Sequence, residues 1–99
     1  MAEALILAFE GVGEKEYRAV NGELGIDMDQ GTGDIPDGLL AHGGGTADDG
    51  RFVVTEVWSS REAQGAFMAN RLGPALAAGG ITATPTVTWV PLLAYHTFG

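Results

Sequence analysis

The stretch "RFVVTEVWSSREAQGAFMANRLGPAL", Arg51–Leu76, changes its periodicity halfway along, and this change decides the fold. Up to Trp58 it is rich in β-branched and aromatic residues, which predicts a strand. Ser59 or Ser60 then caps a predicted helix, and Glu62 lies in the first turn, where the helix dipole favours an acid. A strand that leads directly into a helix is therefore expected.

The predicted helix has one apolar face and a break near its end. The apolar face consists of Ala63, Ala66, Phe67, Leu72 and Leu76. Pro74 has no amide donor and clashes with the preceding turn, so "RLGPAL" predicts a kink, or a stop and restart. Gly79 and Gly80 are expected to end the element.

The remaining elements follow by working outward from this stretch. They are a strand over Ala4–Phe9, a helix over Glu14–Leu24 with Gly25 as its C-cap, a strand over Leu39–Gly43 and a strand over Thr86–Leu93. The resulting order, βαββαβ, is that of the ferredoxin-like fold. This α+β fold places two helices on one face of a four-stranded antiparallel sheet. With 99 residues, the chain suffices for a single domain over 1–99.

The segment Asp27–Gly38 is crowded with turn formers and begins like a calcium-binding loop of the EF-hand type. Thr32 stands where the sharp turn of that loop needs glycine, and Gly38 stands where a bidentate glutamate should close the site. We therefore expect a solvated loop before the next strand.

The segment "HGGG", His42–Gly45, has two interpretations. In some lipases and esterases such a run forms an oxyanion hole, but the chain has no G-x-S-x-G nucleophile motif and is too short for the sheet that presents one. In the favoured interpretation, His42 is the last inward side chain of a strand. The glycines then turn the chain toward the strand Arg51–Trp58, with positive φ angles.

Composition and charge exclude several classes of function. A net charge of −8 with five basic residues argues against binding to nucleic acid and to anionic membranes. No apolar run approaches the roughly 20 residues of a spanning helix. Met1–Leu7 lacks the basic flank and cleavage site of a signal peptide, so we expect a cytoplasmic protein. The absence of cysteine fits a reducing compartment.

The predicted strands are apolar on both faces. In the strand before the second helix, one face carries Phe52, Val54, Glu56 and Trp58, and the other carries Val53, Thr55 and Val57. The chain's own helices can cover only one face of the sheet. We therefore expect a homodimer, in which the second face packs against another copy related by a two-fold axis.

The run Phe52–Leu76, together with a final strand that leads toward His96, resembles the dimeric α/β barrel superfamily, and within it the antibiotic biosynthesis monooxygenase-like branch. Its most specific part is E-x-W-x-S-x-E-A, Glu56–Ala63. The resemblance implies that the sheets of two subunits pack into one barrel. Members of the superfamily include cofactor-free oxygenases, lactone isomerases, haem-dependent enzymes and plain ligand binders, so fold alone does not define activity.

The resemblance also implies a pocket between helices and sheet, with candidate catalytic residues His42, Trp58 and Arg71. If His42 faces the pocket, its imidazole can exchange a proton with a phenol or enol; otherwise it is a strand residue bonded to a carbonyl. Trp58 would stack on a flat ligand or pack in the core. Glu56 shares its strand face and needs a partner, for which Arg71 and Arg51 are the candidates.

Four further residues are candidates for substrate binding beside Glu56. Tyr17, Phe67 and Met68 lie at helical positions, where they either fill the core or line the pocket. His96 lies in the tail, where it could reach the partner subunit or fray. Two histidines far apart make a poor metal site and a poor haem site, so no metal and no cofactor are expected.

The predicted function is that of a small cofactor-independent monooxygenase, which acts on an aromatic or polyketide-type phenol or enol. The enolate of such a substrate can reduce O₂ itself, while the protein deprotonates it, orients it and excludes water. The alternatives are a proton-transfer isomerase or cyclase that uses the same pocket, and a non-catalytic dimeric protein with a ligand-binding or stress-associated role.

Overall fold

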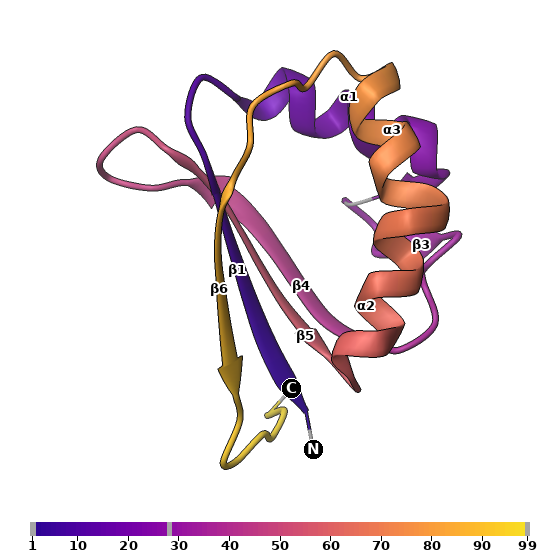
Figure 1. Cartoon of the computed structure of the whole chain (residues 1–99), viewed down its shortest axis with the longest axis vertical. Coiled ribbons are helices and arrows are strands. Elements are labelled where there is room, and N and C mark those ends of the chain that lie inside the picture. The colour runs from indigo at the N-terminus through magenta and orange to yellow at the C-terminus, as the bar shows by residue number, and fades with distance from the viewer. Residues whose placement is uncertain (1, 28, 99) are drawn as a thin grey trace.

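A four-stranded antiparallel sheet forms one layer of the protein, and helices form the other (Figure 1). The structure, a computed structural model, describes residues 2–27 and 29–98. Met1 in the N-terminal segment, Met28 in the expected loop and Gly99 in the tail lie outside the described residues. The strands lie in the order β4 (Leu39–Thr46), β5 (Phe52–Trp58), β1 (Glu3–Phe9) and β6 (Thr86–Pro91). This places β4 and β6 at the edges.

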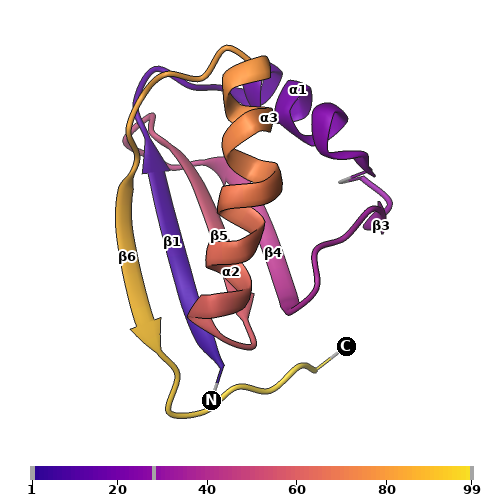
Figure 2. The same ribbon diagram turned by 45° about the vertical axis from the view of Figure 1, so that its right-hand side comes forward.

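All of the helices lie on the same side of this sheet (Figures 1 and 2). They are α1 (Glu14–Leu24), α2 (Arg61–Phe67), the π-helical turn η1 (Met68–Leu72) and α3 (Gly73–Ala78). The last three run on as one interrupted helix. The predicted ferredoxin-like architecture is therefore confirmed.

The ends of the helices follow from local chemistry. The carboxylate of Glu16 accepts a hydrogen bond from the amide of Gly13 at 3.1 Å, ahead of α1, and Gly25 ends that helix with φ +74°. At the start of α2, the Oγ of Ser60 accepts a hydrogen bond from the amide of Ala63 at 3.1 Å. Ser60 is thus the cap of α2, and the C-cap predicted at Gly25 is confirmed.

The predicted break in the second helix takes the form of a π-helical turn. In η1 the helix accommodates an additional residue, and α3 restarts at Gly73. Pro74 consequently lies in the first turn of α3, where its missing amide donor is tolerated. Gly79 and Gly80 follow the end of α3 as expected.

Strand β4 corrects the prediction for the three glycines. They are not a turn: Gly43, Gly44 and Gly45 pair with Thr55, Val54 and Val53 of β5, and none of the three has a positive φ. The turn lies further on, at residues 47–50, where Gly50 has φ +90°. At Gly44 the physical reason for glycine is the close approach of the Tyr17 side chain from α1.

Two other boundaries differ from the predictions. The segment expected to be a solvated loop contains a short ribbon, in which β2 (Ile26–Asp27) pairs with β3 (Thr32–Gly33). The last strand ends at Pro91 rather than at Leu93. Proline is tolerated at this position of an edge strand, because Pro91 lies opposite Glu3 and the next hydrogen bond to the N-terminal segment, 3.0 Å from the amide of Leu92 to the carbonyl of Ala2, does not involve it.

The core lies between the sheet and the helices, as the face pattern of the strands predicts. Its buried apolar side chains include Leu5, Leu7, Phe9, Val20, Leu24, Phe52, Val54, Trp58 and Phe67. The opposite face of the sheet has no helix over it (Figure 1). Within residues 2–27 and 29–98, no helix has the length and apolar character that a membrane span requires.

Candidate active site

A cavity of about 210 Å³ lies between the helices and the sheet, where the resemblance implies a pocket. Most of its wall is apolar and comes from every layer of the fold, including Leu7 of β1, Val54 of β5 and Phe67 of α2. The titratable side chains that line it, among the described residues, are Tyr17, His42 and Glu56. Met68 also lines it. The cavity can therefore hold an apolar ligand against a small polar group of side chains.

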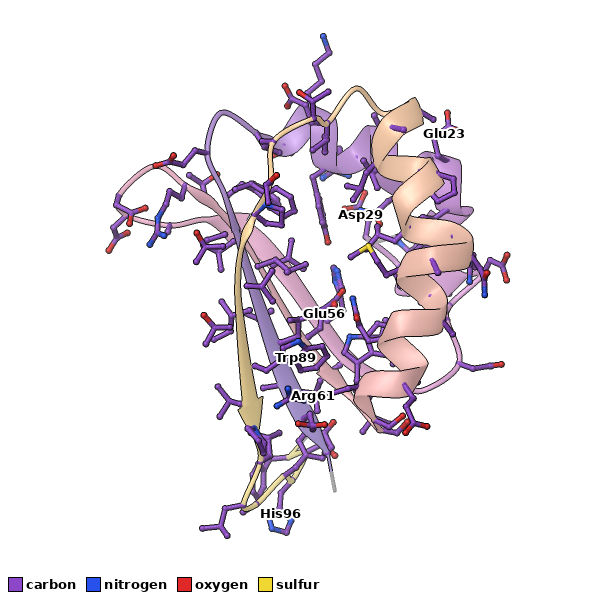
Figure 3. All side chains as sticks on the ribbon, viewed as in Figure 1. Glu23, Asp29, Glu56, Arg61, Trp89 and His96 are labelled. Carbon is purple, nitrogen blue, oxygen red and sulfur yellow. The ribbon has the colours of Figure 1, made fainter. Side chains whose placement is uncertain are left out.

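Strand pairing brings His42 and Glu56 together. The two residues are opposite each other in the register of β4 and β5, so their side chains share the helix-covered face of the sheet. Nε2 of His42 lies 3.6 Å from Oε2 of Glu56, and the side chains are only 16% and 6% exposed. Figure 3 shows Glu56 in the space between the sheet and the helices. His42 and Glu56 therefore form an acid–base pair that is largely shielded from solvent.

Trp58 lies behind Glu56 instead of lining the cavity. Its indole Nε1 donates a hydrogen bond of 3.0 Å to Oε1 of Glu56. Its side chain is 0% exposed, and its ring packs 5.6 Å from that of Phe67. Of the two roles expected for Trp58, packing in the core describes its position, and the ring does not form a stacking wall. Residues two apart in a strand point to the same side. Trp58 is therefore next to Glu56, and its indole N–H fixes the position of the Glu56 carboxylate.

Tyr17 reaches the same site from α1. Its hydroxyl lies 3.3 Å from Nδ1 and 3.4 Å from Nε2 of His42. The phenol and imidazole rings are nearly parallel, at 14°, and the phenol ring also packs 4.8 Å from Phe52. Tyr17 is therefore both a wall of the cavity and a polar contact of His42.

Burial sets the protonation states of this group. Desolvation lowers the pKa of His42 below its ordinary value of 6.5. It raises the pKa of Glu56 above 4.5, an effect that the hydrogen bond from Trp58 opposes. It also raises the pKa of Tyr17 above 10. The imidazole is therefore neutral at neutral pH and can accept a proton.

Arg71 lies outside the acid–base group. Its Nη2 donates to the carbonyl oxygens of Leu24 at 2.9 Å and Asp34 at 2.7 Å, and it lies 3.4 Å from the Asp34 carboxylate. Arg71 thus ties η1 to the end of α1 and the segment after β3. It is not the partner of Glu56, and neither is Arg51, which pairs with Asp49 at 2.9 Å. The partners of Glu56 are Trp58 and His42.

The structure does not bring His96 to the cavity. Its exposed side chain lies in the C-terminal tail, beyond the end of the sheet (Figure 3), and its ring is 6.2 Å from that of Phe98. Asn21 was not predicted, yet it lines the cavity from α1 and donates to the carbonyl of Tyr17 at 3.0 Å. The sequence pattern that could have predicted this role is a polar residue four positions after Tyr17, on the apolar side of the same helix.

Over residues 2–27 and 29–98, no three or more His, Cys, Asp or Glu side chains gather in a group that could hold a metal ion.

Taken together, the strand order, the helices on one face and the cavity between the layers define a ferredoxin-like α+β domain. Solved structures with this fold include Rv0793 from Mycobacterium tuberculosis, with a TM-score of 0.68 and 19% identity over 98% of this chain and 100% of that one. A protein from Chloroflexus aurantiacus that is assigned as an antibiotic biosynthesis monooxygenase has a TM-score of 0.66 and 20% identity, with both chains fully covered.

A third similar structure is SnoaB, a cofactor-independent oxygenase from Streptomyces nogalater, with a TM-score of 0.65 and 16% identity over 97% of this chain and 95% of that one. No protein-family model matches the chain, and no curated protein matches it in sequence. At these identities the likeness is one of fold, and it confirms the fold that the run Phe52–Leu76 led us to expect.

Proposed function

We propose that this protein is a cofactor-independent monooxygenase that acts on a small aromatic phenol or enol bound in the cavity. The observation that carries the proposal is the meeting of His42, Glu56 and Tyr17 on one side of an otherwise mainly apolar cavity. An apolar chamber suits an aromatic ring, and a neutral imidazole suits its hydroxyl. The fold shared with SnoaB, which is a cofactor-independent oxygenase, also supports the proposal.

In the proposed first step, His42 accepts the proton of the phenol or enol. The carboxyl of Glu56, 3.6 Å from the imidazole, stabilises the imidazolium that forms, and Trp58 holds that carboxyl in place. These interactions act in a partly dry space, where charges interact more strongly than in water. The ligand becomes an electron-rich anion.

In the proposed second step, a ring carbon of the anion, which carries one hydrogen, combines with O₂. The C–O bond forms as the anion's electrons reduce O₂ to a peroxide anion, and the imidazolium protonates that peroxide. Loss of water, made from the distal oxygen, the carbon-bound hydrogen and a proton, leaves a new C=O group. All electrons come from the ligand, so no external reductant is required. The residues of the cavity bind, orient and shield the anion.

Oxygen uptake with 1-naphthol tests this proposal, because its conversion with O₂ to 1,4-naphthoquinone and water balances without another reactant. His42→Ala should lower turnover by roughly 10²–10⁴-fold. His96→Ala is the matched control, since this histidine lies outside the cavity, and it should leave turnover unchanged. Because burial lowers the pKa of His42, turnover should persist at pH 6.5 and fall at lower pH, as the imidazole becomes protonated.

The same experiment separates the alternatives. Binding of 1-naphthol without oxygen uptake would contradict the oxygenase and favour a proton-transfer isomerase or cyclase, or a plain ligand binder. Equal turnover in His42→Ala and the parent protein would remove His42 from the mechanism.

We also propose that the protein is a homodimer, joined through the sheet face that no helix covers. That face carries Ala4 and Ile6 of β1, Val53 and Val57 of β5 and Val90 of β6. Ile6 and Val90 are 36% and 40% exposed. Covering such a face with a second copy removes apolar surface from water, which stabilises a small domain.

A further inference from the structure

A second hollow lies beside the cavity, on the other side of Tyr17. This outer groove has a volume of about 270 Å³ and lies between α1 and β4, with Arg18 and the glycines Gly43–Gly45 among its lining residues. Tyr17, His42 and Phe52 line both the cavity and the outer groove. These three side chains therefore form a partition between the two spaces.

Close packing holds Tyr17 in this partition. Its ring contacts Phe52, and its hydroxyl contacts His42. On the side of β4 it lies over Gly44, where a Cβ atom would come within 2.9 Å of both Cζ and the hydroxyl oxygen of Tyr17. Real Cβ atoms essentially never approach so closely. Glycine at position 44 is thus the condition for the observed position of the ring.

The two spaces differ in chemistry. The cavity is walled mainly by apolar side chains. The outer groove is edged by Glu14 and Arg18, which form an exposed ion pair at 2.9 Å, and is lined along β4 by glycines without side chains. An aromatic ring system gains more by remaining on the apolar side of the partition.

The cavity volume limits what fits on that side. At about 210 Å³ it exceeds the roughly 150 Å³ of an apolar cavity known to hold benzene. It is smaller than the roughly 300 Å³ at which sites for drug-sized ligands begin. One or two fused rings therefore match the space, whereas a third ring would need room beyond the partition.

We propose that Tyr17 is the size-determining wall of the cavity, so that the protein selects one- and two-ring phenols and rejects three-ring ones. The inference rests on the proposed function, because a hydroxyl held at His42 places the ligand directly against the partition. As long as Tyr17 remains over Gly44, the ring system of that ligand cannot extend into the outer groove.

Fluorescence titration with 2-naphthol and 2-hydroxyanthracene tests the proposal. The parent protein should bind 2-naphthol at least tenfold more tightly. Tyr17→Ala joins the cavity to the outer groove and should bring the two affinities within threefold of each other. Tyr17→Phe keeps the ring but not the hydroxyl, so it should retain the tenfold selection. Tyr17→Leu, which keeps apolar bulk, provides a second shortened side chain if Tyr17→Ala does not fold, and should reduce the selection at least threefold.

An unchanged ratio of affinities in the folded shortened variants would overturn the role of Tyr17, as would equal binding of the two phenols by the parent protein. Oxygen uptake with 1-naphthol, and its loss in His42→Ala, reports on the proposed function separately. Size selection without oxygen uptake would overturn the proposed function and leave the wall. Oxygen uptake together with size selection that does not depend on Tyr17 would overturn the wall alone. Binding of neither phenol would overturn both.

Discussion

At the scale of single residues, Glu56 connects the core of the protein to the cavity. One of its oxygens accepts the indole N–H of Trp58, and the other faces His42. The sequence predicts that Glu56 and Trp58 share a face, because they lie two apart in a strand. The sequence does not predict that the indole N–H of Trp58 donates its hydrogen bond to the Glu56 carboxyl and is therefore not available to a ligand. That outcome depends on side-chain rotamers within a packed core.

Replacement of Glu56 by glutamine should reveal the cost of burying its carboxylate. Since the pKa of Glu56 is raised, the folded state binds the proton more tightly than the unfolded chain does. The resulting stabilisation is fully present below the unfolded pKa near 4.5 and is lost as pH rises through the higher folded pKa. Urea unfolding of Glu56→Gln and the parent protein at pH 4 to 8 should therefore show a difference that moves in favour of the variant as pH rises.

The size of that change measures the shift itself, since each pKa unit corresponds to about 1.4 kcal/mol. His42 contributes an opposite slope, because its lowered pKa removes stability as pH falls below 6.5. Because His42 lies 3.6 Å from Glu56, this slope differs between the two proteins, and the same comparison in a His42→Ala background removes it. A difference that instead favoured the parent protein at higher pH would mean that Glu56 is stabilised as a carboxylate, contrary to the proposed environment.

At the scale of elements, β4 shows where local sequence is misleading. Three successive glycines are typical of a turn, yet here they continue a strand. At Gly44 the cause is a tertiary contact, because Tyr17, from a helix far away in the sequence, occupies the space that a side chain at position 44 would need. No local pattern around the glycines carries this information.

In the interrupted second helix, local sequence predicts the break correctly. It does not predict the tertiary contacts that the residues at the break make. Pro74 predicts the break near 71–76, and η1 and α3 place it there. The contacts of Arg71 with the carbonyl oxygens of Leu24 and Asp34 could not be foreseen, since every residue carries such an oxygen. For this reason the sequence suggested Glu56 as the partner of Arg71, whereas Arg71 binds the two carbonyl oxygens instead.

If contact with Tyr17 requires glycine at position 44, alanine substitutions at positions 44 and 45 of β4 should have unequal effects on the stability of the protein. Gly44→Ala should destabilise the protein by about 1–3 kcal/mol, because the methyl group would force Tyr17 to move. Gly45→Ala adds the same methyl group on the outward side of β4, where no atom of the same chain lies within 4 Å of a Cβ, so it should cost less than Gly44→Ala. Chemical unfolding measures both.

A double-mutant cycle identifies the cause of the effect at position 44. In the Tyr17→Ala background the ring is gone, so the cost of Gly44→Ala should largely disappear. A cost that persists there, or one that is equal at positions 44 and 45, would show that strand propensity and not the Tyr17 contact explains the effect.

At the scale of the whole molecule, charge and apolar surface are separated. The chain carries a net charge of −8, yet the outward-facing positions of the sheet contain no charged residue within the described part of the chain. They are occupied by alanine, valine, isoleucine, threonine and glycine, as the register of the four strands shows. Two copies can approach through this face without bringing like charges together.

The proposed dimer predicts a strong effect of a single charge on that face. Ile6 lies on the outward side of β1, a central strand, so Ile6→Lys would place an ammonium group in the middle of the contact. The two-fold axis doubles the penalty, and each unpaired buried charge costs several kcal/mol. Sedimentation velocity at micromolar concentration should show a dimer for the parent protein and a monomer for Ile6→Lys.

Val87→Lys is the control for this comparison. Val87 lies on the edge strand β6, opposite Leu7 and hence on the helix side of the sheet, and is 53% exposed. A lysine there keeps its charge in water and should leave the dimer intact, although it adds the same charge to the chain. If Val87→Lys dissociated the protein as readily as Ile6→Lys, net charge and not the outer face would govern association. A parent protein that stayed monomeric and stable at micromolar concentration would contradict the dimer itself, because the outer face would then be stable in water.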